Sequence, residues 1–190
     1  MPTGIQKYMI IDGQQRMTTL TLLFIALREY AIQNPGDTTI NARRIDNLLL
    51  TNEYECGDDR YKPLPTETDR EILIALVEGK PIAENTKSRL LDNYSFFAGK
   101  IAGMELLPAE IYESVGKLQI VNITLDRTLD DAQAIFESLN STGKALSESD
   151  LIRNYVLMGL EPKEQAYIYE HLWRPMEKLF MYETQDSVMD

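Results

Sequence analysis

The stretch at residues 8–32 constrains the fold of this chain more than any other. A short, apolar, β-favouring run at residues 8–11 is followed by the turn dipeptide Asp12-Gly13. Neither Gly nor Pro interrupts residues 17–32, and residues 20–27 read LTLLFIAL. A helix that is apolar on nearly every side is buried, because no face of it suits water. The sequence therefore predicts a strand, a tight turn and a long central helix.

The turn between this strand and this helix carries groups that suit an anion. Gln14, Gln15 and Arg16 lie at the predicted helix N-terminus, where free backbone N–H groups and the positive end of the helix dipole converge. A cation and two amides there can hold a phosphate. Asp12 can accept from a ribose hydroxyl, carry a metal ion or polarise a water molecule. The alternative is an ordinary Asp-Gly hairpin turn with a solvated Arg16, although the residues after the turn do not alternate as a second strand would.

A second polar motif follows more than a hundred residues later. Residues 136–146 read FESLNSTGKAL, and residues 150–154 read DLIRN. Structural roles explain most of it, since Asn140 can close a helix, Gly143 can supply the exit turn and Asp150 can cap the next helix. In the functional interpretation, Asn140, Lys144 and Asp150 share one exposed edge. If that edge faces residues 12–16, the two motifs enclose a polar pocket.

The two motifs together resemble the GmrSD-type family. Its ParB/sulfiredoxin-like N-terminal domains occur in modification-dependent (type IV) restriction enzymes and related phage-defence proteins. IIDGQQRMTTLTLL at residues 10–23 is similar to the family's DGQQR signature, and residues 136–154 resemble its second signature. The resemblance extends in order over about residues 8–180. It implies that the DGQQR segment binds and hydrolyses a nucleoside triphosphate, and that this activity licenses a nuclease located elsewhere.

The resemblance also implies roles for residues of this chain. The expected cofactor is a nucleoside triphosphate with Mg²⁺, and the expected partners are the nucleotide, modified DNA and an HNH-type nuclease domain or subunit. In the alternative interpretation, the chain is a non-catalytic module that binds DNA or a partner. Asp12 and Arg16 are the catalytic candidates, with Asp12 as the metal ligand, and the cofactor-binding candidates are Gly13, Gln14, Gln15, Arg16, Thr18, Asn140, Lys144 and Asp150.

The predicted fold is α+β, with a small mixed sheet in a ParB/sulfiredoxin-like core and a predominantly helical C-terminal extension. The strongest strand candidate, LQIVNITL at residues 118–125, is expected beside the strand at residues 8–11. We expect one domain, with residues 1–126 as a core that contains a helical insertion and residues 127–190 as the extension. Family members begin further upstream of DGQQR, so we expect an N-terminally truncated domain with an exposed sheet edge.

Local patterns between the two strand candidates predict a short hairpin and several helices. The hairpin pairs residues 48–51 with residues 60–64, and one helix runs from Thr66 or Thr68 to Gly79. A second helix opens near residues 85–86, and a third starts at Pro108. The second helix has one apolar face, which predicts core packing rather than a base-stacking platform; its residues are Leu90, Tyr94, Phe97 and Ile101.

Composition narrows the possible functions. Lys and Arg total 19 against 30 Asp and Glu, and the net charge of −11 argues against non-specific DNA binding as the main activity. One histidine, His171, and one cysteine, Cys56, are too few for an HNH, zinc or Cys–His site in this chain. The single cysteine fits a reducing compartment, and no apolar run is long enough to cross a bilayer. We therefore expect a cytoplasmic protein without a membrane association.

Overall fold

The computed structural model describes residues 8, 10, 12–65, 67–105, 107–125, 135, 152, 155–157, 160, 164, 167–176 and 179. The chain divides into two compact units, Met1–Val121 and Asn122–Asp190. The first unit contains α1 (Gln14–Gln33), α2 (Ala42–Ile45), η1 (Asp46–Leu50), η2 (Gly57–Arg60), α3 (Glu67–Glu78), α4 (Arg89–Ala102) and α5 (Pro108–Gly116). The second unit contains the helical turn η3 (Tyr169–Trp173). None of the described helices is long and apolar enough to span a bilayer.

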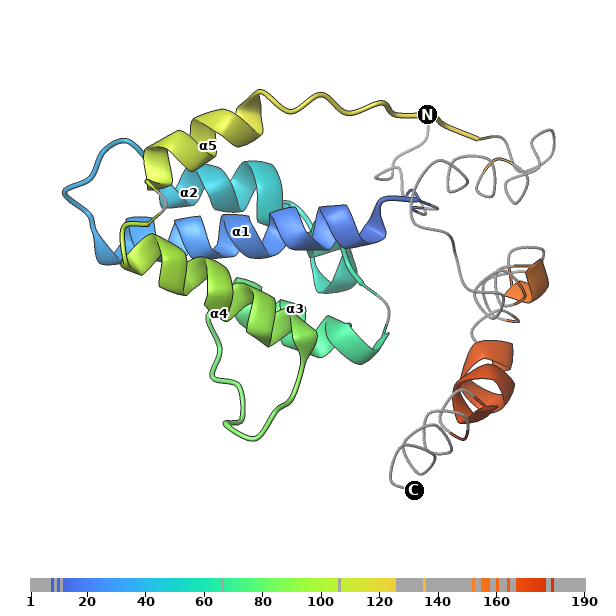
Figure 1. Cartoon of the computed structure of the whole chain (residues 1–190). Coiled ribbons are helices and arrows are strands. Elements are labelled where there is room, and N and C mark those ends of the chain that lie inside the picture. Colours follow the sequence, from blue (N-terminus) through green and yellow to red (C-terminus); the bar gives the residue numbers. More distant parts are fainter. Residues whose placement is uncertain are drawn as a thin grey trace, which may run out of the picture. The chain divides into compact units, whose positions relative to one another are not determined.

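The helix α1 is the centre of the first unit, as its sequence predicts. It packs against α2, η1, α4 and α5, with α2 and α5 on one side of it and α4 on the other (Figure 1). Leu22, Ile25 and Leu27 are among the most deeply buried side chains, and each is 1% exposed or less. Burying such side chains stabilises the unit by about 1.5–3 kcal/mol each, so α1 organises its core.

The predicted helix α3 is confirmed together with its apolar face. Leu73, Leu76 and Val77 are buried in the same core as α1. The helix ends at a left-handed Gly79, whose φ is +64°. The N–H of Lys80 donates to the Ala75 carbonyl at 2.8 Å, and the N–H of Gly79 donates to the Leu76 carbonyl at 3.3 Å. This is the Schellman arrangement that a glycine just after a helix predicts.

The helix α4 begins slightly later than its sequence suggests. Its N-cap is Ser88, whose side chain accepts from the Leu90 N–H, rather than a residue near position 85. Leu90 and Ile101 are buried, and Tyr94 and Phe97 pack against the core from the same face. The predicted core role of this face is therefore confirmed. Pro108 occupies the first turn of α5, also as expected.

The expected α+β fold with a small mixed sheet is wrong for the residues that the structure describes. Tyr8 and Ile10 belong to no strand, and residues 118–125 have no pairing partner within the described chain. Ile120 and Val121 are 73% and 85% exposed, which a central strand would not allow. β-branched side chains favour an extended backbone, but a sheet also requires a partner strand, which local sequence does not specify.

The short hairpin is reduced to one antiparallel bridge between Thr51 and Tyr61. The N–H of Asn52 donates to the Arg60 carbonyl at 2.7 Å, and the N–H of Lys62 donates to the Leu50 carbonyl at 2.9 Å. The turn η2 closes the loop between the two segments. The predicted pairing is therefore limited to this one bridge, because residues 48–50 lie in the helical turn η1 rather than in a strand.

Candidate functional site

The DGQQR turn has the backbone geometry that its sequence predicts. Gly13 has φ +86° and ψ 8°, in the left-handed region that residues with a Cβ atom rarely adopt. The carboxylate of Asp12 accepts from the Gly13 N–H at 2.6 Å. The side-chain amide of Gln14 donates to the Ile10 carbonyl at 2.7 Å, which ties the preceding segment to the helix. These contacts fix the direction in which the chain enters α1.

The N-terminus of α1 has no side-chain cap in the described structure, and no acidic residue lies in its first turn. The N–H of Met17 donates to the Gly13 carbonyl at 2.9 Å and makes the first intrahelical hydrogen bond. The backbone N–H groups of Gln14, Gln15 and Arg16 precede that bond, so they lie at the positive end of a 20-residue helix dipole. This arrangement favours an anion.

Arg16 folds back over the turn. Its Nη2 atom lies 2.7 Å from the Asp12 Oδ2 atom, and the Arg16 and Asp12 side chains are 75% and 40% exposed. The guanidinium passes above Gly13, where a Cβ atom added to the glycine would lie 3.5 Å from the Arg16 Nη2 atom. Both carboxylate oxygens of Asp12 are therefore engaged, one by a backbone N–H and one by a cation.

Thr18 lies one turn further along α1 than the backbone N–H groups at the N-terminus of the helix. Its hydroxyl donates to the Gln14 carbonyl at 2.9 Å, a bond that a threonine inside a helix commonly makes. Residues 12–16 and Thr18 are thus brought together at one helix end. The sequence also predicts a pocket between the two motifs, with three residues of the second motif on its other wall. These three residues lie outside the described residues; they are Asn140, Lys144 and Asp150.

A metal ion at this site would depend on Asp12. The described residues contain no group of three or more His, Cys, Asp and Glu side chains that could hold a metal. Mg²⁺ is commonly bound by one or two carboxylates, with phosphate oxygens and water filling its other positions. A lone Asp12 would fit that pattern if a phosphate were bound beside it, and it does not fit a metal site made by the protein alone.

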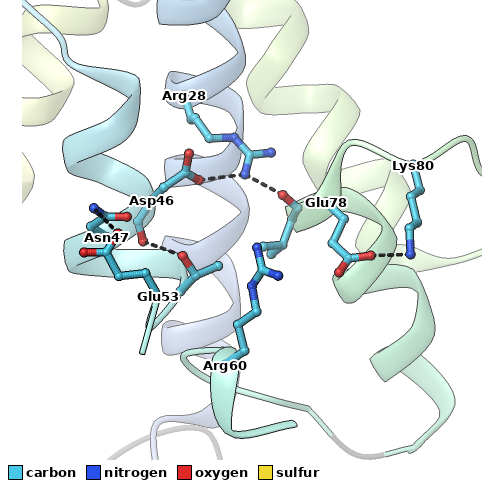
Figure 2. Close-up of a pocket in the computed structure, with 9 residues that line it drawn as sticks. Arg28, Asp46, Asn47, Glu53, Arg60, Glu78 and Lys80 are labelled. Carbon is cyan, nitrogen blue, oxygen red and sulfur yellow. Dashed lines mark hydrogen bonds and ion pairs between the residues drawn. The ribbon is translucent and has the colours of Figure 1, made fainter. Parts of the chain in front are cut away.

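The structure also contains a polar pocket of about 560 Å³ that the sequence did not reveal (Figure 2). Arg28 lies at its wall and is only 4% exposed. Its Nη1 atom donates to Asp46 at 2.9 Å and to the Val77 carbonyl at 2.6 Å. None of the residues predicted for the site lines this pocket; its lining consists of Arg28, Asp46, Asn47, Thr51, Glu53, Arg60, Val77, Glu78 and Lys80.

The contacts of Arg28 assign it a structural role. Its Nη2 atom donates to Glu29 at 2.8 Å and to the Leu76 carbonyl at 3.0 Å, so the guanidinium caps the C-terminus of α3 and joins α3 to α1. Asp46 and Glu29 neutralise the positive charge of Arg28, so the buried arginine stabilises the wall of the pocket. A single arginine directly after the apolar run at residues 20–27 was the only sequence signal for this network.

A second set of paired groups includes two residues that line the pocket, Glu78 and Lys80. Glu78 is paired with Lys80 at 2.5 Å and accepts from the Tyr61 hydroxyl at 2.5 Å. The hydrogen bonds from Lys80 and then Tyr61 lower the pKa of Glu78, and the bond to Glu78 raises the pKa of Tyr61. Most of the charged side chains that line the pocket are therefore already paired with neighbouring protein groups. The N-terminus of α1, where the Arg16–Asp12 ion pair is exposed to solvent and the first N–H groups have no side-chain cap, is the better candidate for a ligand.

Comparison with known protein families gives a match. A family model described as "GmrSD restriction endonuclease, N-terminal domain" matches residues 2–157, which include the DGQQR turn and the whole second motif at residues 136–154. No curated protein and no solved structure matches the chain.

Proposed function

Since the chain belongs to the GmrSD restriction endonuclease N-terminal-domain family, we propose that it binds and hydrolyses a nucleoside triphosphate and thereby licenses a nuclease located elsewhere. The family connects the chain with restriction and phage defence, in nuclease-containing systems that act on DNA. The observation that carries the nucleotide proposal is the uncapped N-terminus of α1 beneath the exposed Arg16 guanidinium. These are the groups that bind phosphate in many proteins.

The polar groups at the N-terminus of α1 have different proposed roles. Arg16 and the backbone N–H groups of Gln14 and Gln15 would hold the phosphates. Asp12 would hold Mg²⁺ beside the phosphates, and the metal would supply positive charge as the terminal phosphoryl group passes to water and the nucleoside diphosphate leaves. Asp12 would orient that metal or the attacking water, and positioning of this kind supplies most of the catalysis in phosphoryl transfer. An HNH-type nuclease and modified DNA are the proposed partners.

Calorimetry on the intact chain tests this function. ATP, GTP, CTP and UTP are titrated with and without Mg²⁺, and release of inorganic phosphate is followed in parallel. We expect at least one Mg²⁺–triphosphate to bind and to be hydrolysed. If none of the four binds at millimolar concentration, the proposed function is wrong.

One observation favours a second function, that of a non-catalytic interaction module. The extended run at residues 118–123 exposes four large apolar side chains, each at least 56% exposed; they are Leu118, Ile120, Val121 and Ile123. Clustered apolar side chains in an extended segment are typical of a surface that binds a partner. The interaction module is the function we would adopt if calorimetry shows no nucleotide binding.

A further inference from the structure

We propose that the groove between the end of α4 and the start of α5 binds an amphipathic helix of a partner protein, in which lysine or arginine flanks the apolar side chains. The groove has a volume of about 620 Å³ and shares no lining residue with the polar pocket around Arg28. Its apolar lining includes Met104, Leu107, Ile111 and Val115, and its acidic lining is Glu105 and Glu110. The proposal does not depend on nucleotide binding.

Met104 occupies a backbone position that favours glycine. Its φ is +54°, and it is the only described residue other than glycine with a positive φ. The N–H of Glu105 donates to the Lys100 carbonyl at 3.1 Å, and the N–H of Met104 donates to the Ile101 carbonyl at 3.0 Å. These two bonds are the Schellman ending of α4, in which the left-handed residue is usually glycine because a Cβ atom is strained there. The methionine therefore costs local stability.

Leu107 also occupies a position that favours another type of residue. It is the N-cap of α5, and its side chain makes no cap hydrogen bond. Ser, Thr, Asp and Asn are favoured at an N-cap because their side-chain oxygens accept from the first free N–H groups of the helix. Leucine has no such oxygen. Both helix ends that meet at the groove thus carry an apolar residue where local chemistry favours a different one.

The fold leaves these two side chains about half exposed, at 54% for Met104 and 44% for Leu107. Residues that break a local rule and stay exposed are typical of a functional surface, because a ligand can then repay the lost stability. Methionine is flexible and adapts to an incoming apolar surface. A groove with apolar side chains of this kind suits the apolar face of an amphipathic helix.

The charges around the groove determine which partner it suits. Its lining contains Glu105 and Glu110, and none of the described lining residues is a lysine or an arginine. Glu105 is paired with Lys100, whereas Glu110 has no ion pair within the described part of the chain. A second copy of this chain, with its net charge of −11, would be repelled, and so would a nucleic acid. Lysine or arginine beside the apolar anchors of a partner would instead pair with these carboxylates.

The groove lies away from the DGQQR turn. Both α4 and α5 pack against α1, and the turn that joins them lies near the end of α1 rather than near its N-terminus (Figure 1). A helix in the groove would therefore leave the proposed phosphate site accessible. Binding at the two places can be measured independently.

The experiment titrates the intact chain into a fluorescent peptide of about 15 residues, with leucine along one helical face and lysine on both sides of that face. Two control peptides replace lysine with glutamate or scramble the same residues. The double variant Met104→Gly, Leu107→Ser removes both apolar side chains and introduces the locally favoured residues. Leu48→Ser is the matched control, because Leu48 is 58% exposed and does not line the groove.

Fluorescence anisotropy should show that the lysine peptide binds the wild type and Leu48→Ser equally. The double variant should bind it at least about tenfold more weakly, from the loss of two apolar contacts. Thermal denaturation should give the double variant a melting temperature equal to or above that of the wild type, since glycine and serine suit these two positions. The glutamate peptide and the scrambled peptide should bind the wild type much more weakly than the lysine peptide does.

Equal binding of the lysine peptide by the wild type and the double variant would overturn the proposal. Equal binding of the lysine and scrambled peptides would also overturn it, because general charge attraction would explain both. Absence of binding at millimolar concentration would do the same. A clearly lower melting temperature of the double variant would assign the two side chains to the fold. Self-association that sedimentation velocity detects in the wild type, and that the double variant abolishes, would assign the groove to a second copy of the chain.

Discussion

At the scale of single residues, the DGQQR turn depends on the backbone of Gly13. Its φ of +86° is strained for any residue with a Cβ atom, whereas the space around it is not limiting, since a Cβ atom placed there would have its nearest neighbour 3.5 Å away. The turn dipeptide in the sequence predicts this conformation, because it depends on local chemistry alone. The ion pair between Asp12 and Arg16 was not predicted, because it depends on how the arginine side chain folds back.

Gly13→Val should destabilise the first unit by about 1–2 kcal/mol, the cost of a left-handed backbone for a residue with a Cβ atom. Thermal or urea denaturation measures the change. Gly36→Val is the matched control, because Gly36 has no positive φ and a Cβ atom added there would have nothing within 4 Å. Equal stability of the two variants would show that the Gly13 turn relaxes without strain.

Asp12→Asn should bind Mg²⁺–triphosphate but hydrolyse it much more slowly. Asparagine has nearly the same shape, but it lacks the negative charge that holds a metal or orients water. Phosphate release under saturating nucleotide measures the effect, and direct binding on the same sample shows that the site is occupied. A variant that hydrolyses at the wild-type rate would remove Asp12 from the chemistry.

At the scale of elements, the sequence predicts helices well and the sheet poorly. The face of α4 from Leu90 to Ile101 and the central position of α1 follow from apolar spacing within each segment. Pairing of residues 8–11 with residues 118–125 would be a contact between distant segments, and local β propensity did not decide it. The Arg28 network was missed for the same reason, since Asp46 and the end of α3 come to it from elsewhere in the chain.

Leu27→Ala should lower the free energy of unfolding by about 2–5 kcal/mol, because the Leu27 side chain is fully buried and its loss leaves a cavity. Ile32→Ala is the control on the same helix, since Ile32 is 56% exposed and its truncation should change stability by well under about 1 kcal/mol. Chemical denaturation of both variants makes the comparison. Similar losses in the two would contradict the central position of α1.

At the scale of the whole molecule, the net charge of the chain opposes the binding of a nucleotide. A chain of net charge −11 repels a triphosphate over long distances, so general attraction cannot supply the affinity. Binding must come from a local arrangement of donors, and the mouth of α1 is the arrangement that the described structure offers. The predicted second wall at Asn140, Lys144 and Asp150 stays a prediction, because these residues lie outside the described residues.

The most direct test of a local phosphate site is a pair of arginine variants titrated with the Mg²⁺–triphosphate that the wild type binds best. Arg16→Ala should weaken binding by about 1.5–3 kcal/mol, the usual contribution of a hydrogen bond to a charged group, and should leave stability nearly unchanged because Arg16 is on the surface. Arg43→Ala removes one exposed positive charge from α2 and should bind as the wild type does. If the two variants lost the same affinity, or if Arg16→Ala lost none, the site would not lie at the N-terminus of α1.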